Sequence, residues 1–149
     1  MNNYLHFINK LLATGLFIGK IPGAPGTYGS ILAVFIILFF PLVTNVFFII
    51  PFIIIATGIS YYEELITGVK DAPEIVIDEI AGILLTFVFI DLNFKIIFVG
   101  FILFRFFDIY KPFIIDKVQE LPYGIGIMAD DLLAGFFSWI ILNIIIIIF

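Results

Sequence analysis

The chain has 149 residues, of which 63% are hydrophobic and only 13% charged, and it contains no cysteine. A soluble domain averages about 25% charged residues, so this composition predicts a single integral membrane domain, residues 1–149. The missing cysteine excludes disulfides, thiolate zinc sites and cysteine nucleophiles. The net charge of −5, without a basic run, argues against nucleic acid as a partner, and the sequence indicates no obligate protein partner.

Residues 4–19 carry apolar side chains at helical spacing, namely Leu5, Ile8, Leu12 and Leu16. This pattern predicts a short amphipathic helix that lies in the membrane surface. His6, the only histidine, falls in this helix, and we interpret it as an interfacial polar residue. Its position argues against a Ser-His-Asp triad.

The next segment, "KIPGAPGTYGS", is rich in turn-forming residues, and Thr27 and Ser30 are predicted to cap the helix that follows. The apolar run 31–59 is divided by Pro41 and Pro51. Its polar pair at positions 44 and 45 predicts a hairpin of two membrane helices.

Three more helices are predicted at about 78–90, 96–107 and 132–149, separated by the polar segment 61–74, the turn 91–95 and the mixed segment 108–131. The fold class is therefore all-α, a membrane bundle of about four to five apolar helices plus the interfacial helix. Several of these pieces have about 13 to 18 residues, fewer than the roughly 20 that cross a bilayer upright. Half-crossing hairpins remain an alternative to full spans.

The distribution of cations predicts a multi-pass topology. If the N-terminus is cytoplasmic and each apolar piece crosses once, only Lys95 falls outside, and the other cations fall at the inner boundary: Lys10, Lys20, Lys70, Arg105, Lys111 and Lys117. The polar segments fall on the same inner side. We therefore expect nearly all chemistry at the cytoplasmic face.

Two acidic motifs resemble each other, "DEIAG" at 78–82 and "DDLLAG" at 130–135. In each, an acidic pair at a predicted helix entrance precedes an Ala-Gly step by about one turn, so that acid and glycine share a helix face. Small residues let a neighbouring helix approach closely. This approach would bring together the carboxylates of Asp78, Glu79, Asp130 and Asp131.

Clustered carboxylates repel one another unless a cation lies among them, and oxygen ligands suit a hard divalent ion such as Mg²⁺. We therefore predict that these four acids hold Mg²⁺, with Asp108 as a further acid nearby. The alternative is structural, because acids also favour helix N-termini through the helix dipole.

The segment "FRFFDIYKPF" supplies positive charge, with Arg105 and Lys111 on either side of Asp108. Charged groups at a membrane boundary are costly unless partnered or hydrated, which favours a functional role. Arg105 and Lys111 are suited to binding a phosphate, although Arg105 and Asp108 could simply form a local ion pair. The loop "PGAPGTYGS" can cradle an anion, and a tight turn into a helix is its structural alternative.

Four motifs, "IPGAPGTYGS", "IVIDEIAG", "FRFFDIYKP" and "GIGIMADDLLAG", resemble in order and separation those of the phosphatidylglycerophosphatase A family. The resemblance implies a magnesium-dependent enzyme of the bacterial cytoplasmic membrane that hydrolyses phosphatidylglycerophosphate to phosphatidylglycerol and phosphate. It implies metal and catalytic acids at Asp78, Glu79, Asp108, Asp130 and Asp131. It implies that the phosphate is bound by the loop residues Gly26, Thr27 and Ser30 and by the cations Arg105 and Lys111. Asp71 also matches a family position.

Two questions of mechanism stay open at this stage. Either Asp108 or Asp131 is the expected base for a water that attacks phosphorus, and a covalent aspartyl-phosphate is the rival route. A non-enzymatic cation transporter or channel is the competing class, in which intramembrane acids line an ion path. The helix interiors between the motifs are almost free of ionisable residues, which favours the enzyme.

Overall fold

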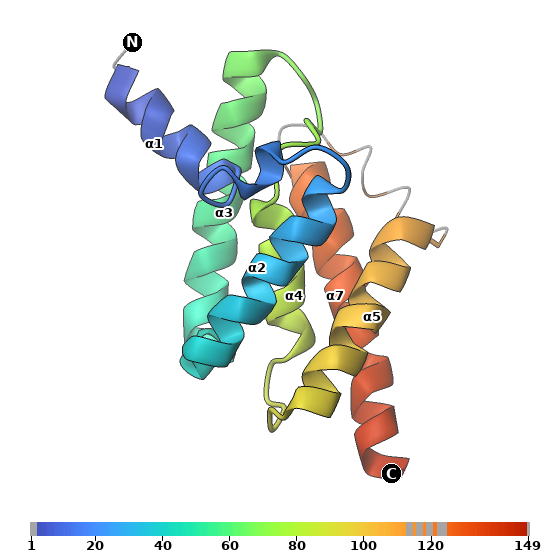
Figure 1. Ribbon diagram of the computed structural model, residues 1–149. Coiled ribbons are helices and arrows are strands. Elements are labelled where there is room, and N and C mark those ends of the chain that lie inside the picture. The colour runs from blue at the N-terminus through green and yellow to red at the C-terminus, as the bar shows by residue number, and fades with distance from the viewer. Residues whose placement is uncertain (1–2, 113–114, 116–117, 119–120, 122–124, 149) are drawn as a thin grey trace.

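The computed structural model describes residues 3–112, 115, 118, 121 and 125–148. Over these residues every regular element is a helix, which confirms the predicted all-α class (Figure 1). The α-helices are α1 (Asn3–Ala13), α2 (Pro25–Phe39), α3 (Val46–Thr67), α4 (Ile77–Thr86), α5 (Phe94–Tyr110) and α7 (Ile125–Ile148). Two short 3₁₀ helices, η1 (Ile18–Lys20) and η2 (Pro41–Thr44), lie on either side of α2.

Helix α1 ends at Ala13, earlier than the predicted boundary at residue 19. Gly15, Leu16 and Phe17 follow with φ of +55°, +59° and +67°, in the left-handed region that a right-handed helix cannot include. The chain therefore turns sharply here, and the exposed Leu16 belongs to this turn rather than to the helix.

The predicted hairpin is present as α2 and α3, joined by η2. Asn45 caps α3, because its side chain accepts a hydrogen bond from the Phe47 N–H at 2.9 Å. The division predicted at Pro51 is wrong, since α3 continues through this proline, which removes only one backbone donor. The segment predicted as polar from residue 61 is helical as far as Thr67, where Gly68 ends α3 with φ of +67°.

Two helices, α3 and α7, are long and apolar enough to cross a membrane. The apolar helix α2 has 15 residues, α4 has 10 and α5 has 17. At about 1.5 Å per residue they extend roughly 22, 15 and 25 Å, less than a hydrocarbon core of about 30 Å. The number of spanning helices among the described residues is thus lower than the four to five expected, while the two long helices suggest membrane association.

Helix α4 lies at the centre of the bundle, with α2, α3 and α7 around it (Figure 1). Eight of its ten residues are buried. A Cβ on Gly135 of α7 would lie 2.4 Å from the Gly82 carbonyl oxygen, and one on Gly82 would lie 2.6 Å from the Asp131 carbonyl oxygen. The expected close approach at the two Ala-Gly steps is therefore confirmed, and it brings the backbones of α4 and α7 into contact.

Three helices, α4, α5 and α7, have boundaries that differ from the predicted ones. Helix α7 begins at Ile125 rather than at residue 132, because Met128 is buried in an apolar cluster with Ala56 and Ala81. Asp130 and Asp131 therefore lie in its second turn and not at its entrance, which removes the helix-dipole explanation for this acidic pair. Helix α4 ends four residues earlier than predicted, and α5 is longer at both ends; its amino end is capped by Asn93.

Candidate active site

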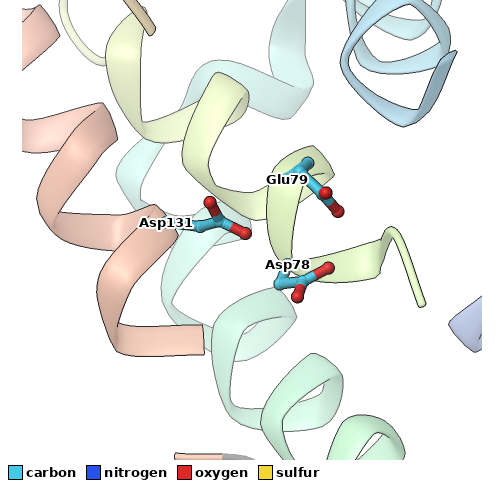
Figure 2. Close-up of side chains that lie close together, drawn as sticks. All are labelled: Asp78, Glu79 and Asp131. Atoms are coloured by element: carbon cyan, nitrogen blue, oxygen red, sulfur yellow. The ribbon is translucent and has the colours of Figure 1, made fainter. Parts of the chain in front are cut away.

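Three carboxylates from two helices converge at the centre of the bundle. Asp78 and Glu79 lie in the first turn of α4, and Asp131 reaches toward them from α7 (Figure 2). One carboxylate oxygen from each lies within 4.8 Å of the other two, an arrangement that can hold a metal ion. Asp78 is 3% and Asp131 4% exposed, while Glu79 is half-buried. We call these three residues the acidic triad.

The chemistry of the acidic triad fits a hard divalent cation. Burial and the neighbouring Glu79 raise the pKa of Asp78 well above its usual value. Burial, partly offset by a hydrogen bond with Asp78, raises the pKa of Glu79 to about 7. Asp78 Oδ1 and Glu79 Oε2 are buried and have no hydrogen-bond partner in the part of the chain that the structure describes. A cation among these oxygens would both neutralise the charges and satisfy the free acceptors.

The amino end of α2 lies directly against the acidic triad. A Cβ on Gly26 would lie 2.3 Å from Glu79 Oε1 and 3.2 Å from Arg105 Nη1, so a larger residue here would displace these two side chains. The predicted capping by Thr27 and Ser30 is wrong, because Pro25 begins the helix and both residues lie within it. Ser30 instead donates its hydroxyl to the Gly26 carbonyl at 2.8 Å, which leaves its oxygen toward Arg105.

Arg105 joins α5 to this site. Its Nη1 forms an ion pair with Asp108 and donates to Ser30 Oγ at 3.4 Å, and the expected local ion pair between Arg105 and Asp108 is therefore present. The Arg105 Nε is buried and has no hydrogen-bond partner among the described residues. Both charges also act on Glu79: the Asp108 carboxylate raises the pKa of Glu79, and the Arg105 guanidinium lowers it.

Asp130 is separated from the acidic triad although it adjoins Asp131 in sequence. Its carboxylate is bound by Lys111 and is not one of the three that gather within 4.8 Å, although its charge contributes to the raised pKa of Asp78. Asp130 Oδ2 accepts a hydrogen bond from Lys111 Nζ at 2.5 Å, and its Oδ1 accepts one from the Asp131 N–H at 3.1 Å. Burial lowers the pKa of Lys111, but the hydrogen bond to Asp130 and the negative charges of Asp130, Asp131 and Asp71 together outweigh burial and leave this pKa raised.

The chain matches the family model described as phosphatidylglycerophosphatase A over residues 11–146. It belongs to the phosphatidylglycerophosphatase A family. Phosphatidylglycerophosphatase A of Haemophilus influenzae is 38% identical over 137 residues, which cover 88% of this chain and 84% of the relative. The Escherichia coli protein of the same name is 33% identical over 133 residues, 86% of this chain and 77% of the relative.

A third relative carries a different name. A Bacteroides thetaiotaomicron protein, assigned provisionally by its name to the phosphatidylinositol-3-phosphatases, is 32% identical over 149 residues that cover 93% of each chain. No solved structure matches the chain significantly. The resemblance drawn from the four motifs is thus confirmed, and this member of the phosphatidylglycerophosphatase A family is an enzyme of the phosphatase class.

The structure divides the predicted acidic residues of this family member between two groups. Asp78, Glu79 and Asp131 form the acidic triad, while Asp130, predicted as a fourth metal ligand, lies on Lys111 instead. Thr27 lies in the first turn of α2, and Lys117 falls outside the described residues.

Asp71, which matched a family position, proves to be electrostatically linked to Lys111. It lies in the connection between α3 and α4 with φ of +51°, which is uncommon for a residue with a side chain. Lys111, at the end of α5, has φ of +38°. For Lys111 this left-handed conformation is that of the residue capping the end of α5, whose N–H donates to the Phe107 carbonyl.

Sequence reasoning missed Glu63, a carboxylate of α3 that is 1% exposed. It accepts a hydrogen bond from Asn9 of α1, far along the chain. A signal was present, since Ala56, Ser60 and Glu63 follow at helical spacing and all three are buried. It was hidden because the segment around residue 63 was interpreted as a polar connection instead of a helix.

Proposed function

We propose that this protein is a Mg²⁺-dependent phosphatase that hydrolyses phosphatidylglycerophosphate to phosphatidylglycerol and phosphate. The observation that carries this proposal is the buried acidic triad with the Gly26 backbone and the Arg105 guanidinium beside it. The family membership and the two relatives named phosphatidylglycerophosphatase A support the choice of lipid. The transporter alternative has no comparable support, since the named relatives are phosphatases.

Asp78, Glu79 and Asp131 are the residues that would hold the metal ion. When bound, a divalent cation supplies a Lewis acid that polarises a phosphoryl oxygen and lowers the pKa of a coordinated water. Asp130, which the sequence analysis predicted as a metal ligand, has a different role in this proposal: it fixes the Lys111 ammonium at the edge of the site.

The phosphate of the substrate would bind between α2 and α5. Arg105 presents an unpartnered Nε toward a ligand, and Lys111 adds a second positive charge. The first turn of α2, with Gly26 and Thr27, contributes the positive end of a helix dipole, and Ser30 lies one turn further along α2. The close fit of Gly26 against Glu79 and Arg105 holds phosphate-binding and acidic groups in one place.

Asp108 is the base in this proposal. Its carboxylate lies outside the acidic triad and is half-buried beside Arg105, while Asp131 belongs to the triad. Asp108 would accept a proton as the water oxygen bonds to phosphorus, and the glycerol oxygen would leave with its bonding electrons and take up a proton. The covalent alternative predicts a phosphorylated aspartate that can be trapped during turnover.

We place the site at the cytoplasmic face of the bacterial inner membrane, in a multi-pass protein. Arg105 and Lys111 lie at the carboxyl end of α5, and Lys95 lies at its amino end. The positive-inside bias therefore supports an orientation with the active site facing the cytoplasm.

Phosphate release from phosphatidylglycerophosphate in mixed micelles tests the proposed function. The wild-type protein should release phosphate in the presence of Mg²⁺. Phosphate release should stop when EDTA is added and resume when Mg²⁺ is restored. Phosphatidylinositol 3-phosphate should be included as a second lipid, because one relative carries the name of that activity. Asp91→Asn, in the exposed connection between α4 and α5, is a matched control and should retain full activity. Hydrolysis that is unaffected by EDTA would contradict the metal requirement.

A further inference from the structure

Helix α1 docks on α3 through polar side chains. Asn9 Nδ2 donates to Glu63 Oε2 at 2.9 Å and to the Ile59 carbonyl at 3.1 Å. The other carboxylate oxygen of this residue, Glu63 Oε1, lies 3.9 Å from His6 Nε2. Glu63 is almost fully buried in this contact, so both sides of its carboxylate face α1. We call His6, Asn9 and Glu63 the polar seam.

Most of the large apolar side chains of α1 are exposed. Tyr4, Leu5, Phe7 and Ile8 are each more than half exposed, while Leu11 is half-buried and Ala13 is fully buried. In an ordinary amphipathic helix the apolar face packs on its own protein. The exposed apolar face of α1 suits a lipid surface, and the polar seam supplies specific contacts that set where α1 sits on α3.

The carboxyl end of α1 is attached to the segment that enters α4. The Val76 N–H donates to the Ala13 carbonyl at 2.9 Å, and Lys10 pairs with Glu74 at 3.6 Å. Beyond α1, a Cβ on Gly19 would lie only 2.2 Å from the Glu74 carbonyl oxygen. Residues 74–76 are therefore enclosed by α1 and the turn that follows it, two residues before Asp78.

These contacts form one continuous path from α3 to the acidic triad. We infer that Glu63 is a positioning residue: by holding Asn9 it fixes α1, and α1 fixes the first turn of α4, where Asp78 and Glu79 lie. This inference rests on the proposed function for its consequence in catalysis, but not for its consequence in structure. Displacements of about 1 Å at reacting groups cost up to roughly 100-fold in rate, so a loosened α1 would lower turnover.

Glu63→Leu and Asn9→Leu test this path from its two sides. Each should lower kcat by about 10-fold or more and leave KM within about twofold, because neither residue belongs to the phosphate-binding groups. The double variant should be no slower than the worse single variant, since both break one interaction. Glu63→Gln keeps the acceptor for Asn9 and should restore kcat. Asn143→Leu, whose amide bonds only within α7, is the matched control and should behave as wild type.

Hydrogen–deuterium exchange at the Val76 amide gives a readout that does not depend on activity. Exchange should accelerate in Glu63→Leu and Asn9→Leu and stay at the wild-type rate in Glu63→Gln and Asn143→Leu. An inactive wild-type protein would overturn the proposed function and leave this measurement intact. Normal exchange and normal kcat in folded Glu63→Leu or Asn9→Leu would overturn the positioning role, and so would a Glu63→Gln variant as impaired as Glu63→Leu.

Discussion

Asp130 and Asp131 are neighbours in sequence but take different partners, and this difference defines the site at the scale of single residues. Asp131 completes the acidic triad, while Asp130 holds Lys111. The sequence predicts that both are functional, because paired acids in an apolar chain are costly. It could not predict that the two acids take different partners, since this depends on where α7 begins, and α7 begins about two turns earlier than predicted, with Met128 buried in the added part.

Asp130→Asn should therefore separate substrate binding from metal binding. The variant loses the charged partner of Lys111, so KM for phosphatidylglycerophosphate should rise about 10-fold, while the Mg²⁺ concentration for half-maximal rate stays as in wild type. Steady-state kinetics at varied lipid and varied Mg²⁺ measure both quantities. An Asp130→Asn variant whose Mg²⁺ requirement increases tenfold would show that Asp130 is a metal ligand after all.

Metal-free protein should become less stable as the pH rises through the range in which Glu79 ionises. The pKa of Glu79 is about 7 in the folded protein and 4.5 ordinarily, so the folded state binds more protons than the unfolded state. The stabilisation is complete below about pH 4.5 and is lost as the pH approaches 7. Thermal unfolding in EDTA should show Tm falling over this interval, less steeply in Glu79→Gln. An equal slope in both proteins would contradict this.

At the scale of elements, the approach of α4 to α7 depends on two glycines. The spacing of Gly82 and Gly135 behind their acids predicts a close crossing, and the structure has one. The sequence also predicts the hairpin of α2 and α3 from its polar pair at 44 and 45. It does not predict that α3 continues through Pro51, because a single proline in a long apolar helix can be accommodated by tertiary packing.

Gly135→Ala should displace α7 from α4 and so disrupt the acidic triad. The new methyl group would lie 2.4 Å from the Gly82 carbonyl oxygen, a backbone atom with no freedom to move aside. We expect a loss of about 1–3 kcal/mol in stability and a fall in activity greater than this loss alone explains. Gly58→Ala on α3 is the matched control, because its methyl group meets nothing within 4 Å. Equal Tm and activity in the two variants would contradict the close crossing.

At the scale of the whole molecule, charge is distributed unevenly along the bundle. Asp91 lies in the exposed connection between α4 and α5 and Lys95 lies in the first turn of α5, while Arg105 and Lys111 lie at the opposite end of α5. The number of full crossings could not be predicted from hydropathy, because α2, α4 and α5 are apolar yet short. Tertiary contacts, and not length alone, decide how such helices sit in a bilayer.

The native chain contains no cysteine, so single-cysteine variants report orientation directly. Lys95→Cys should react with an impermeant maleimide added outside intact cells, and Lys70→Cys only after the inner membrane is opened. Both positions are exposed in the structure. Labelling of Lys70→Cys in intact cells would place the acidic site on the outer face and contradict the proposed orientation.

Titration of Mg²⁺ into metal-free protein in detergent, followed by calorimetry, tests the acidic triad most directly. Wild-type protein and Asp91→Asn should bind the ion with the same affinity, and Asp131→Asn, nearly isosteric and without the charge, should bind it at least about 10-fold more weakly. Folded Asp131→Asn protein with wild-type affinity for Mg²⁺ would show that Asp78, Glu79 and Asp131 do not form the metal site.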